Sequence, residues 1–328
     1  MNFCLIGCGD IANTMHAPAF EQYHQKHPDF HLTACCDPRP ERAAAMQKLL
    51  GFERYYVDYK EMLSREKPDA VAVIVSETAS VNVGVDVLRA GIPMLIEKPP
   101  GRLSSETARL IAQAQSQGVP CQVAFNRRYM PVLSAMRALA PENIQLVTYD
   151  MIRCERRDRN FANTAVHAID AVRFLADADY RYVRFTYLEM PEYGEGVCNV
   201  FMDCLMTSGA QAQIRICPMS GASLERAAIH AKGRMLLGYT PVWGGYDAPG
   251  RIEDFRDGKE PLVTAFDPCD VYQNNGFLAE DEAFFDALKA GKKPNPDIAS
   301  AMNTMLVKEC IDQRQAEFRM DQMSSLER

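Results

Sequence analysis

Three polar side chains in the stretch NTAVHAID, residues 163–170, are spaced so that they could act together. Asn163, His167 and Asp170 stand four and three residues apart, which brings side chains to one face of a helix. Histidine suits proton transfer near neutral pH, and an amide or carboxylate neighbour could orient its ring. The spacing predicts either part of a catalytic site or one turn of ordinary helix. Two ligands three residues apart do not define a metal site, so no metal is predicted.

A second charged pair stands in MLIEKPPG, residues 94–101, where Glu97 and Lys98 follow an apolar run and precede prolines. In open α/β sheets, ligands bind beyond the carboxyl ends of the strands. A lysine at such an end can be partly desolvated and take part in proton transfer. Taken alone, the pair is more typical of a solvated strand end.

The stretch GCGDIA, residues 7–12, matches the G-x-G-x-x-G/A fingerprint between a predicted strand and a predicted helix. Gly7 allows the tight turn, Gly9 lets a pyrophosphate approach the backbone, and Ala12 keeps the helix close to the strand. The pyrophosphate would lie at the helix N-terminus, beside Asp10 and Ile11. We therefore predict a dinucleotide site here.

Asp37 ends the next predicted strand and favours NAD over NADP, because a carboxylate hydrogen-bonds a ribose 2′-hydroxyl and repels a 2′-phosphate. Arg39 could accept that phosphate, so NADP stays the weaker alternative and both residues are assigned to the cofactor site.

The first third of the chain alternates apolar runs with helical stretches. Such a pattern predicts a doubly wound parallel sheet, the Rossmann arrangement. The predicted strands are 2–7, 30–37, 70–76, 93–99 and 121–126, and the predicted helices are 11–25, 40–50, 80–91 and 104–118.

After residue 130 the strands follow one another with little helix between them. Their alternation predicts an α/β domain on an open, mostly antiparallel sheet. The predicted strands are 144–155, 182–190, 196–206, 210–218 and 226–239, with a hairpin at Asp257-Gly258 and helices 131–140, 164–177, 277–291 and 298–316. We predict domains 1–123 and 124–328.

Composition narrows the function classes. The net charge is −7 and no long basic run occurs, which argues against a nucleic-acid partner. The first apolar run, FCLIGCG, is too short for an export signal or membrane span. Eleven cysteines without a CxxC pair indicate neither a disulfide framework nor a zinc site. We expect a cytoplasmic protein without membrane association.

Taken together, these stretches resemble the Gfo/Idh/MocA oxidoreductases, which include glucose–fructose oxidoreductase and inositol dehydrogenase. The resemblance spans nearly the whole chain and implies a Rossmann domain followed by an α/β domain. It implies NAD(P)-dependent oxidation of a secondary hydroxyl of a sugar, cyclitol or related polyol, in a homodimer or homotetramer formed through the open sheet. It rests on GCGDIANTMHAPAF, CDPRPERA, DVLRAGIPMLIEKP, VAFNRRYMP, HAIDAVRFL and EDEAFFDALKAGKKP.

The resemblance also implies site residues. Lys98 matches the family lysine that contacts the nicotinamide ribose and the reacting hydroxyl, and His167 matches the family histidine. We expect Asn163 and Asp170 beside them, and Ser76, Glu97 and Asn126 at the cofactor. The expected substrate contacts are His167, Arg128, Tyr129, Arg153 and Arg156, with Arg157 and Arg159 as further candidates for binding a carboxylate or hydroxyls.

Two departures from the family pattern keep other functions open. The loop VSETAS, residues 75–80, lacks the family's Thr-Pro and following histidine. Asn163 stands where many family dehydrogenases have aspartate, so it can orient His167 but supplies no charge, and His167 should be a weaker base. One alternative is an enzyme that uses NAD transiently, for elimination or epimerisation of a sugar. Another is a non-catalytic sensor of NAD or a metabolite.

Overall fold

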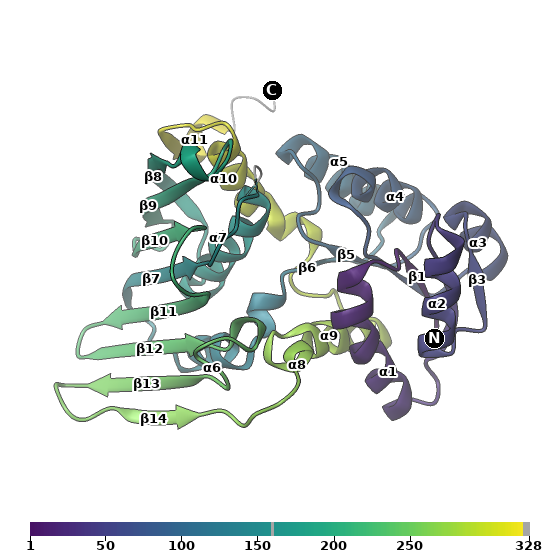
Figure 1. Ribbon diagram of the computed structural model, residues 1–328, viewed down its shortest axis with the longest axis horizontal. Coiled ribbons are helices and arrows are strands. Elements are labelled where there is room, and N and C mark those ends of the chain that lie inside the picture. The colour runs from purple at the N-terminus through teal and green to yellow at the C-terminus, as the bar shows by residue number, and fades with distance from the viewer. Residues whose placement is uncertain (159–160, 324–328) are drawn as a thin grey trace. The chain divides into compact units, whose positions relative to one another are not determined.

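The computed structural model describes residues 1–158 and 161–323, and it divides into two compact units (Figure 1). Unit 1 comprises Met1–Phe125 and Phe277–Met302, and unit 2 comprises Asn126–Gly276 and the chain from Asn303 onward. The predicted boundary lay two residues earlier and gave 277–302 to the second domain. The structure corrects this assignment, because that segment packs within unit 1.

Unit 1 is built on a six-stranded parallel sheet with the order β3-β2-β1-β4-β5-β6. The predicted Rossmann arrangement is confirmed, and β3 and α3 are additions to it. The strands are β1 (Asn2–Ile6), β2 (His31–Cys36), β3 (Arg54–Tyr56), β4 (Ala70–Val73), β5 (Met94–Glu97) and β6 (Cys121–Ala124). The helices between them are α1 (Ala17–Lys26), α2 (Pro40–Leu50), α3 (Tyr59–Glu66), α4 (Glu77–Arg89) and α5 (Ser104–Gln117).

Both faces of this sheet are covered, which explains its continuous apolar strands. Along β5, Leu95 joins the core formed with α1 and α2. Its neighbours Met94 and Ile96 point to the opposite face, as alternate strand residues do. There they approach Gly84 of α4 so closely that a Cβ would lie 3.2 Å from either side chain.

Helix α9 (Phe277–Lys289) completes the core of unit 1 from far along the chain. Phe285 is fully buried, with its ring centroid 4.6 Å from that of Phe30 and 5.2 Å from that of Phe3. Gln122 of β6 donates its side-chain amide to the carbonyl of Glu280 at 3.2 Å. The short turn η5 (Ile298–Ala301) packs on α5 and β6 within the same unit.

Unit 2 is built on a nine-stranded sheet with the order β14-β13-β12-β11-β7-β10-β9-β8-β15. Among the described strands of this sheet only β7 and β10 pair in parallel, which confirms the mostly antiparallel prediction. The strands are β7 (Ile144–Ile152), β8 (Tyr180–Glu189), β9 (Cys198–Met206), β10 (Gln211–Cys217), β11 (Leu224–Ala231), β12 (Arg234–Thr240), β13 (Arg251–Arg256), β14 (Leu262–Ala265) and β15 (Glu317–Arg319).

Two turns of this sheet can be compared with the strands and hairpin predicted from the sequence. The predicted hairpin at Asp257-Gly258 is present, and both residues have left-handed φ values of 49° and 71°. The single strand predicted over 226–239 is wrong, because it is the hairpin of β11 and β12. The chain reverses at Gly233, whose φ of 72° favours glycine.

Helices α6 (Pro131–Leu139), α7 (Ala162–Ala176) and α10 (Met302–Asp312) contribute to one core with the inward residues of this sheet. The other face is wetter: on β10, Gln211, Gln213 and Arg215 are exposed while the residues between them are buried. Short elements complete the described chain, namely the turns η3 (Pro191–Tyr193) and η4 (Val242–Gly244) and the helices α8 (Val271–Asn274) and α11 (Met320–Met323). Across residues 1–158 and 161–323, no helix has the length and apolar character needed to cross a membrane.

Candidate active site

The fingerprint loop of unit 1 is packed tightly on one side and open on the other. Gly7 has a φ of 97°, and its amide donates to the Cys36 carbonyl at 2.8 Å. A Cβ on Gly7 would stand 2.0 Å from the Ile74 carbonyl oxygen, so only glycine fits. A Cβ on Gly9 would meet nothing nearer than the Arg42 guanidinium at 3.8 Å. The loop therefore leaves room at Gly9 for a group to approach the backbone.

The helix after the loop begins with a π-helical turn, η1 (Ala12–His16), and continues as α1. Asp10 and Ile11 are exposed at its start, whereas Ala12 is buried in the core. The side-chain amide of Asn13 donates to the carbonyls of Cys8 and Gly9 at 3.0 and 2.8 Å. These hydrogen bonds direct the two loop carbonyls toward Asn13. The first backbone N–H groups of the helix have no carbonyl partner within the helix and are available on its exposed side.

Asp37 is buried at the end of β2 and holds the fingerprint loop. Its carboxylate accepts the Cys8 and Arg39 amides, both at 3.0 Å, and the Arg39 Nε at 3.3 Å. Burial alone would raise the pKa of Asp37, but these hydrogen bonds outweigh it and lower that pKa. Asp37 is thus an anion in contact with the loop, and Arg39 is its ion-pair partner.

The strand order places the topological switch point between β1 and β4. Ligands of doubly wound sheets bind at this point, beyond the carboxyl ends of the strands. Gly7 and Gly9 follow β1 there. Ser76 follows β4 as the exposed N-cap residue of α4, with its hydroxyl 3.0 Å from that of Thr78.

Lys98 follows β5 at the same edge of the sheet and is half-buried. Its backbone amide donates to Oε2 of Glu97 at 2.7 Å, and a cis peptide bond joins it to Pro99. Glu97 therefore folds back on the lysine backbone.

Sequence reasoning left Glu97 without a partner, and the structure supplies two. His16 is fully buried, and its Nε2 lies 3.2 Å from Glu97 Oε1 while its Nδ1 lies 3.0 Å from Asp281 of α9. Burial alone would lower the pKa of His16, but Asp281 and Glu97 outweigh it and raise that pKa to about 10. A signal for Asp281 exists in the sequence, because it precedes the core residue Phe285 by one helical turn and so faces the core.

Helix α7 of unit 2 carries Asn163, His167 and Asp170, as predicted. Asn163 lies in its first turn and is half-buried, His167 is largely buried, and Asp170 is fully buried. The helix is buried on almost every side. Asn163 and His167, four residues apart, share one face.

Asp170 takes part in a buried ion-pair network, and its predicted catalytic role stays a prediction. Arg128 binds it with two parallel hydrogen bonds, each 2.7 Å long, and Thr304 donates to it at 3.3 Å. Arg173 lies 3.6 Å from the same carboxylate and also pairs with Asp179. Asp170 and Arg128 thus form a buried ion pair that fixes the segment η2 (Asn126–Tyr129) to α7.

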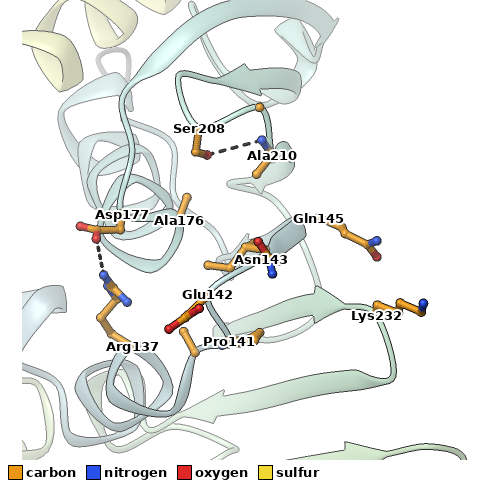
Figure 2. Close-up of a pocket in the computed structure, with 13 residues that line it drawn as sticks. Arg137, Pro141, Glu142, Asn143, Gln145, Ala176, Asp177, Ser208, Ala210 and Lys232 are labelled. Carbon is orange, nitrogen blue, oxygen red and sulfur yellow. Dashed lines mark hydrogen bonds and ion pairs between the residues drawn. The ribbon is translucent and has the colours of Figure 1, made fainter.

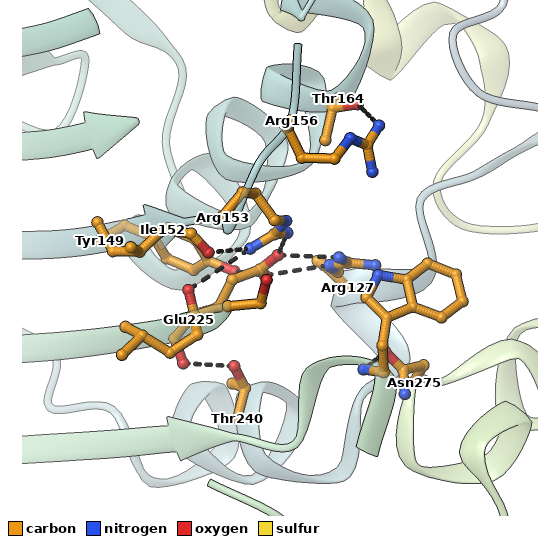
Figure 3. A network of polar contacts seen from close by, with 12 residues as sticks. Arg127, Tyr149, Ile152, Arg153, Arg156, Thr164, Glu225, Thr240 and Asn275 are labelled. Atoms are coloured by element: carbon orange, nitrogen blue, oxygen red, sulfur yellow. Dashed lines mark hydrogen bonds and ion pairs between the residues drawn. The ribbon is translucent and has the colours of Figure 1, made fainter. Parts of the chain in front are cut away.

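Arg153 belongs to a buried network around Glu225 of β11 (Figure 3), and its predicted contact with substrate stays a prediction. Arg127 donates to both oxygens of Glu225, at 3.1 and 2.9 Å, and Tyr149 donates at 2.5 Å. Burial alone would raise the pKa of Glu225, but the two arginines lower it well below its usual range. Strand pairing produces this network, because β11 lies beside β7 and brings Glu225 to the end of β7, next to Arg153.

The remaining predicted residues of unit 2 lie in the short helix η2 and in the segment that follows β7. Asn126 is buried and donates to the Asn275 carbonyl at 2.8 Å, and Tyr129 is half-buried. Arg156 pairs with Asp158, its Nε lying 2.8 Å from the carboxylate. Arg157 is exposed, and Arg159 lies outside the described residues.

A pocket of about 970 Å³ opens in unit 2 where α6 and α7 end (Figure 2). Its charged lining residues are Arg137, Glu142, Asp177 and Lys232. None of the predicted site residues lines this pocket. In the described part of the chain, no group of three or more histidine, cysteine, aspartate or glutamate residues is arranged to hold a metal ion.

Comparison with known proteins supports the reading of unit 1. Residues 1–125 match the model of the Gfo/Idh/MocA oxidoreductase family, described as an NAD-binding Rossmann fold. A D-glucoside 3-dehydrogenase of Escherichia coli is 27% identical over 129 residues, which are 39% of this chain and 36% of that protein. A myo-inositol dehydrogenase of Streptomyces leeuwenhoekii is 26% identical over 53% of this chain and 55% of its own.

Among solved structures, a levoglucosan dehydrogenase in complex with NADH and L-sorbose superposes with a TM-score of 0.82. The superposition covers 99% of this chain and 100% of that one at 16% identity, a likeness of fold alone. The sequence matches span between a third and three fifths of the curated relatives' length. Residues 1–125 of the chain thus match the NAD-binding Rossmann fold of the Gfo/Idh/MocA oxidoreductase family.

Proposed function

We propose that this chain is an NAD-dependent dehydrogenase that oxidises a secondary hydroxyl of a sugar, cyclitol or related polyol. The observation that carries the proposal is the fingerprint loop at the switch point of unit 1, open at Gly9 and tied to the ionised Asp37. Relatives named as glucoside and inositol dehydrogenases support the substrate class.

The residues present fit a dinucleotide. The exposed amides at the helix start would bind the pyrophosphate, and Asp37 would accept the adenosine ribose 2′-hydroxyl. Since Arg39 is already paired with Asp37, little free positive charge is left for a 2′-phosphate, which supports NAD over NADP. Ser76 and Glu97 would line the same edge.

When bound, NAD would accept the hydride from the hydroxyl-bearing carbon. Lys98, as the uncharged amine, would hydrogen-bond the reacting hydroxyl and take up its proton. His167 is the second proton acceptor that we propose, with Asn163 orienting its ring. Arg128, which is paired with Asp170, would contribute to substrate binding from η2.

The test is a spectrophotometric screen for NADH formation across polyols and sugars, with Lys98→Met beside the wild type. We expect at least one substrate to be oxidised and the variant to lose about a thousandfold in kcat, a loss typical of removing a proton-transfer group. Lys48→Met, an exposed lysine of the same unit, is the matched control and should keep full activity.

Absence of turnover on every polyol would refute the dehydrogenase proposal. Substrate conversion without NADH accumulation would instead indicate transient use of NAD for elimination or epimerisation. NAD binding without any conversion would indicate a sensor.

We also propose that the protein forms a homodimer or homotetramer through the open face of the nine-stranded sheet. A cytoplasmic location stays a prediction from the cysteine content.

A further inference from the structure

The buried contact chain Asp281–His16–Glu97–Lys98 joins three segments of unit 1 that are far apart in sequence. His16 closes the π-helical turn after the fingerprint loop, Glu97 ends β5, and Asp281 belongs to α9. The exposed fractions of the His16 and Asp281 side chains are 0%, and that of Glu97 is 14%. Phe20 stacks on the His16 ring and Phe277 meets it edge-on, at centroid distances of 5.6 and 5.1 Å.

Both ring nitrogens of His16 face carboxylate oxygens. Nδ1 lies 3.1 and 3.0 Å from the two oxygens of Asp281, and Nε2 lies 3.2 Å from Glu97. A neutral imidazole carries one N–H donor, so one of these contacts would bring a lone pair against a carboxylate. With both carboxylates ionised, only the doubly protonated ring can donate to both. His16 is thus a buried cation between two anions.

The orientation of Glu97 depends on this cation. One carboxylate oxygen faces His16 and the other accepts the Lys98 amide at 2.7 Å. A carboxylate held at both oxygens has a fixed plane, and the next residue along the chain is the lysine that we propose for catalysis.

We propose that His16, anchored by Asp281, is a positioning residue that fixes Glu97 and through it the backbone of Lys98. The cation therefore serves the dehydrogenase chemistry without touching the substrate. This inference rests on the proposed function for its catalytic consequence, whereas its geometric part stands by itself.

If His16 only joined α9 to the first helix, its contact with Glu97 would not be needed. Tyr23 of α1 already donates to Asp286 of α9 at 2.8 Å, two turns of α1 beyond His16. That second contact holds the same two helices together and involves neither Glu97 nor Lys98. It provides the matched control.

The experiment compares wild type, His16→Gln and Asp286→Asn by amide hydrogen exchange, resolved to single residues. We expect His16→Gln to speed exchange of the Lys98 amide at least tenfold, while the amides of Leu95 and Ile96 in the β5 ladder stay protected. Because residues 99 and 100 are proline, Lys98 is the last exchanging amide of this stretch, which isolates its signal. Asp286→Asn should leave the Lys98 amide unchanged.

Steady-state kinetics then test the catalytic consequence. We expect His16→Gln to lower kcat at least tenfold while KM for NAD and the polyol stays within about twofold, and Asp286→Asn to keep both. Should His16→Gln fail to fold, Asp281→Asn replaces it, because its amide keeps the size of the side chain and removes the anchoring charge.

Unchanged exchange at Lys98, or faster exchange of the whole sheet together, would overturn the geometric part. Faster exchange at Lys98 with an unchanged kcat would overturn the positioning role. A wild type that oxidises no polyol would refute the proposed function, while the exchange data would still decide the geometry.

Discussion

Single residues decide cofactor choice, and Asp37 is the residue on which we expect NAD preference to depend. Its carboxylate pairs with Arg39 and holds the Cys8 amide. Asp37→Ser should remove the repulsion of a 2′-phosphate and release the Arg39 guanidinium. We expect kcat/KM to fall at least tenfold with NAD and to rise with NADP, which kinetics with both cofactors would measure.

The control for this change is Glu41→Gln, an exposed carboxylate in the first turn of α2. It alters the charge near Arg39 without touching the loop. An unchanged cofactor preference in Asp37→Ser, with the protein folded, would contradict the assignment of Asp37.

A second residue, Asn163, tests whether His167 acts as a base. Asn163→Asp places a carboxylate one helical turn before His167, where it can stabilise the protonated ring. We expect kcat/KM to rise severalfold, at most about tenfold, which corresponds to 1.4 kcal/mol. In a His167→Gln background the same substitution should bring no gain, and an equal gain in both backgrounds would remove His167 from the proposed mechanism.

At the scale of elements, the sequence predicts what is encoded locally. The strands of unit 1 are continuous apolar runs bounded by turn residues, so the Rossmann order follows from them. The segment 277–302 could not be assigned this way, because Phe285 finds its partners Phe3 and Phe30 more than 250 residues earlier, and no local pattern encodes that contact.

The residues of the candidate site also differ in whether their contacts are encoded locally. Gly7, Gly9 and Asp37 belong to a motif whose roles are set by neighbours along the chain, and the structure gives each a matching geometry. Arg153 is predicted as a site residue because it lies in the segment leading to the helix of His167, and Asp170 because it follows His167 by one helical turn. Their partners, Glu225 and Arg128, are 72 and 42 residues away and are brought there by sheet pairing and helix packing.

The contacts of His16 with Asp281 of α9 and Glu97 of β5 should make the stability of the protein depend on pH. The pKa of His16 is raised from 6.5 to about 10, so the folded state holds a proton that the unfolded state releases. The stabilisation is complete below pH 6.5 and is lost as pH rises through 10. Between these limits the free energy of unfolding should fall by about 1.4 kcal/mol per pH unit from this group.

Calorimetry of wild type and His16→Gln at pH 6, 7, 8 and 9 would measure the effect. The difference in stability between the two proteins should shrink steadily as the pH rises. A difference that stays constant over this range would mean that His16 is not held as a cation.

At the scale of the whole molecule, the outward face of the nine-stranded sheet is the surface on which we expect self-association. Side chains on this face mix apolar groups with ion pairs. Phe201 and Leu205 alternate with inward residues of β9, and Arg184 pairs there with Asp203. A stable dimer buries about 1,200–2,000 Å² in total, and a broad, mixed sheet face can supply such an area.

Phe201→Lys tests this surface, because it places a cation beside Arg215, the residue paired with Phe201 on β10. We expect light scattering after size-exclusion chromatography to give a multiple of the monomer mass for wild type and the monomer mass for the variant. Tyr246→Lys, which changes a side chain that is 82% exposed on the loop between β12 and β13, should keep the wild-type mass. Since Phe201 points away from the core of unit 2, the variant should keep its circular dichroism spectrum. A monomeric wild type, or a variant that still associates, would show that this face is exposed to solvent and does not bind a second copy of the chain.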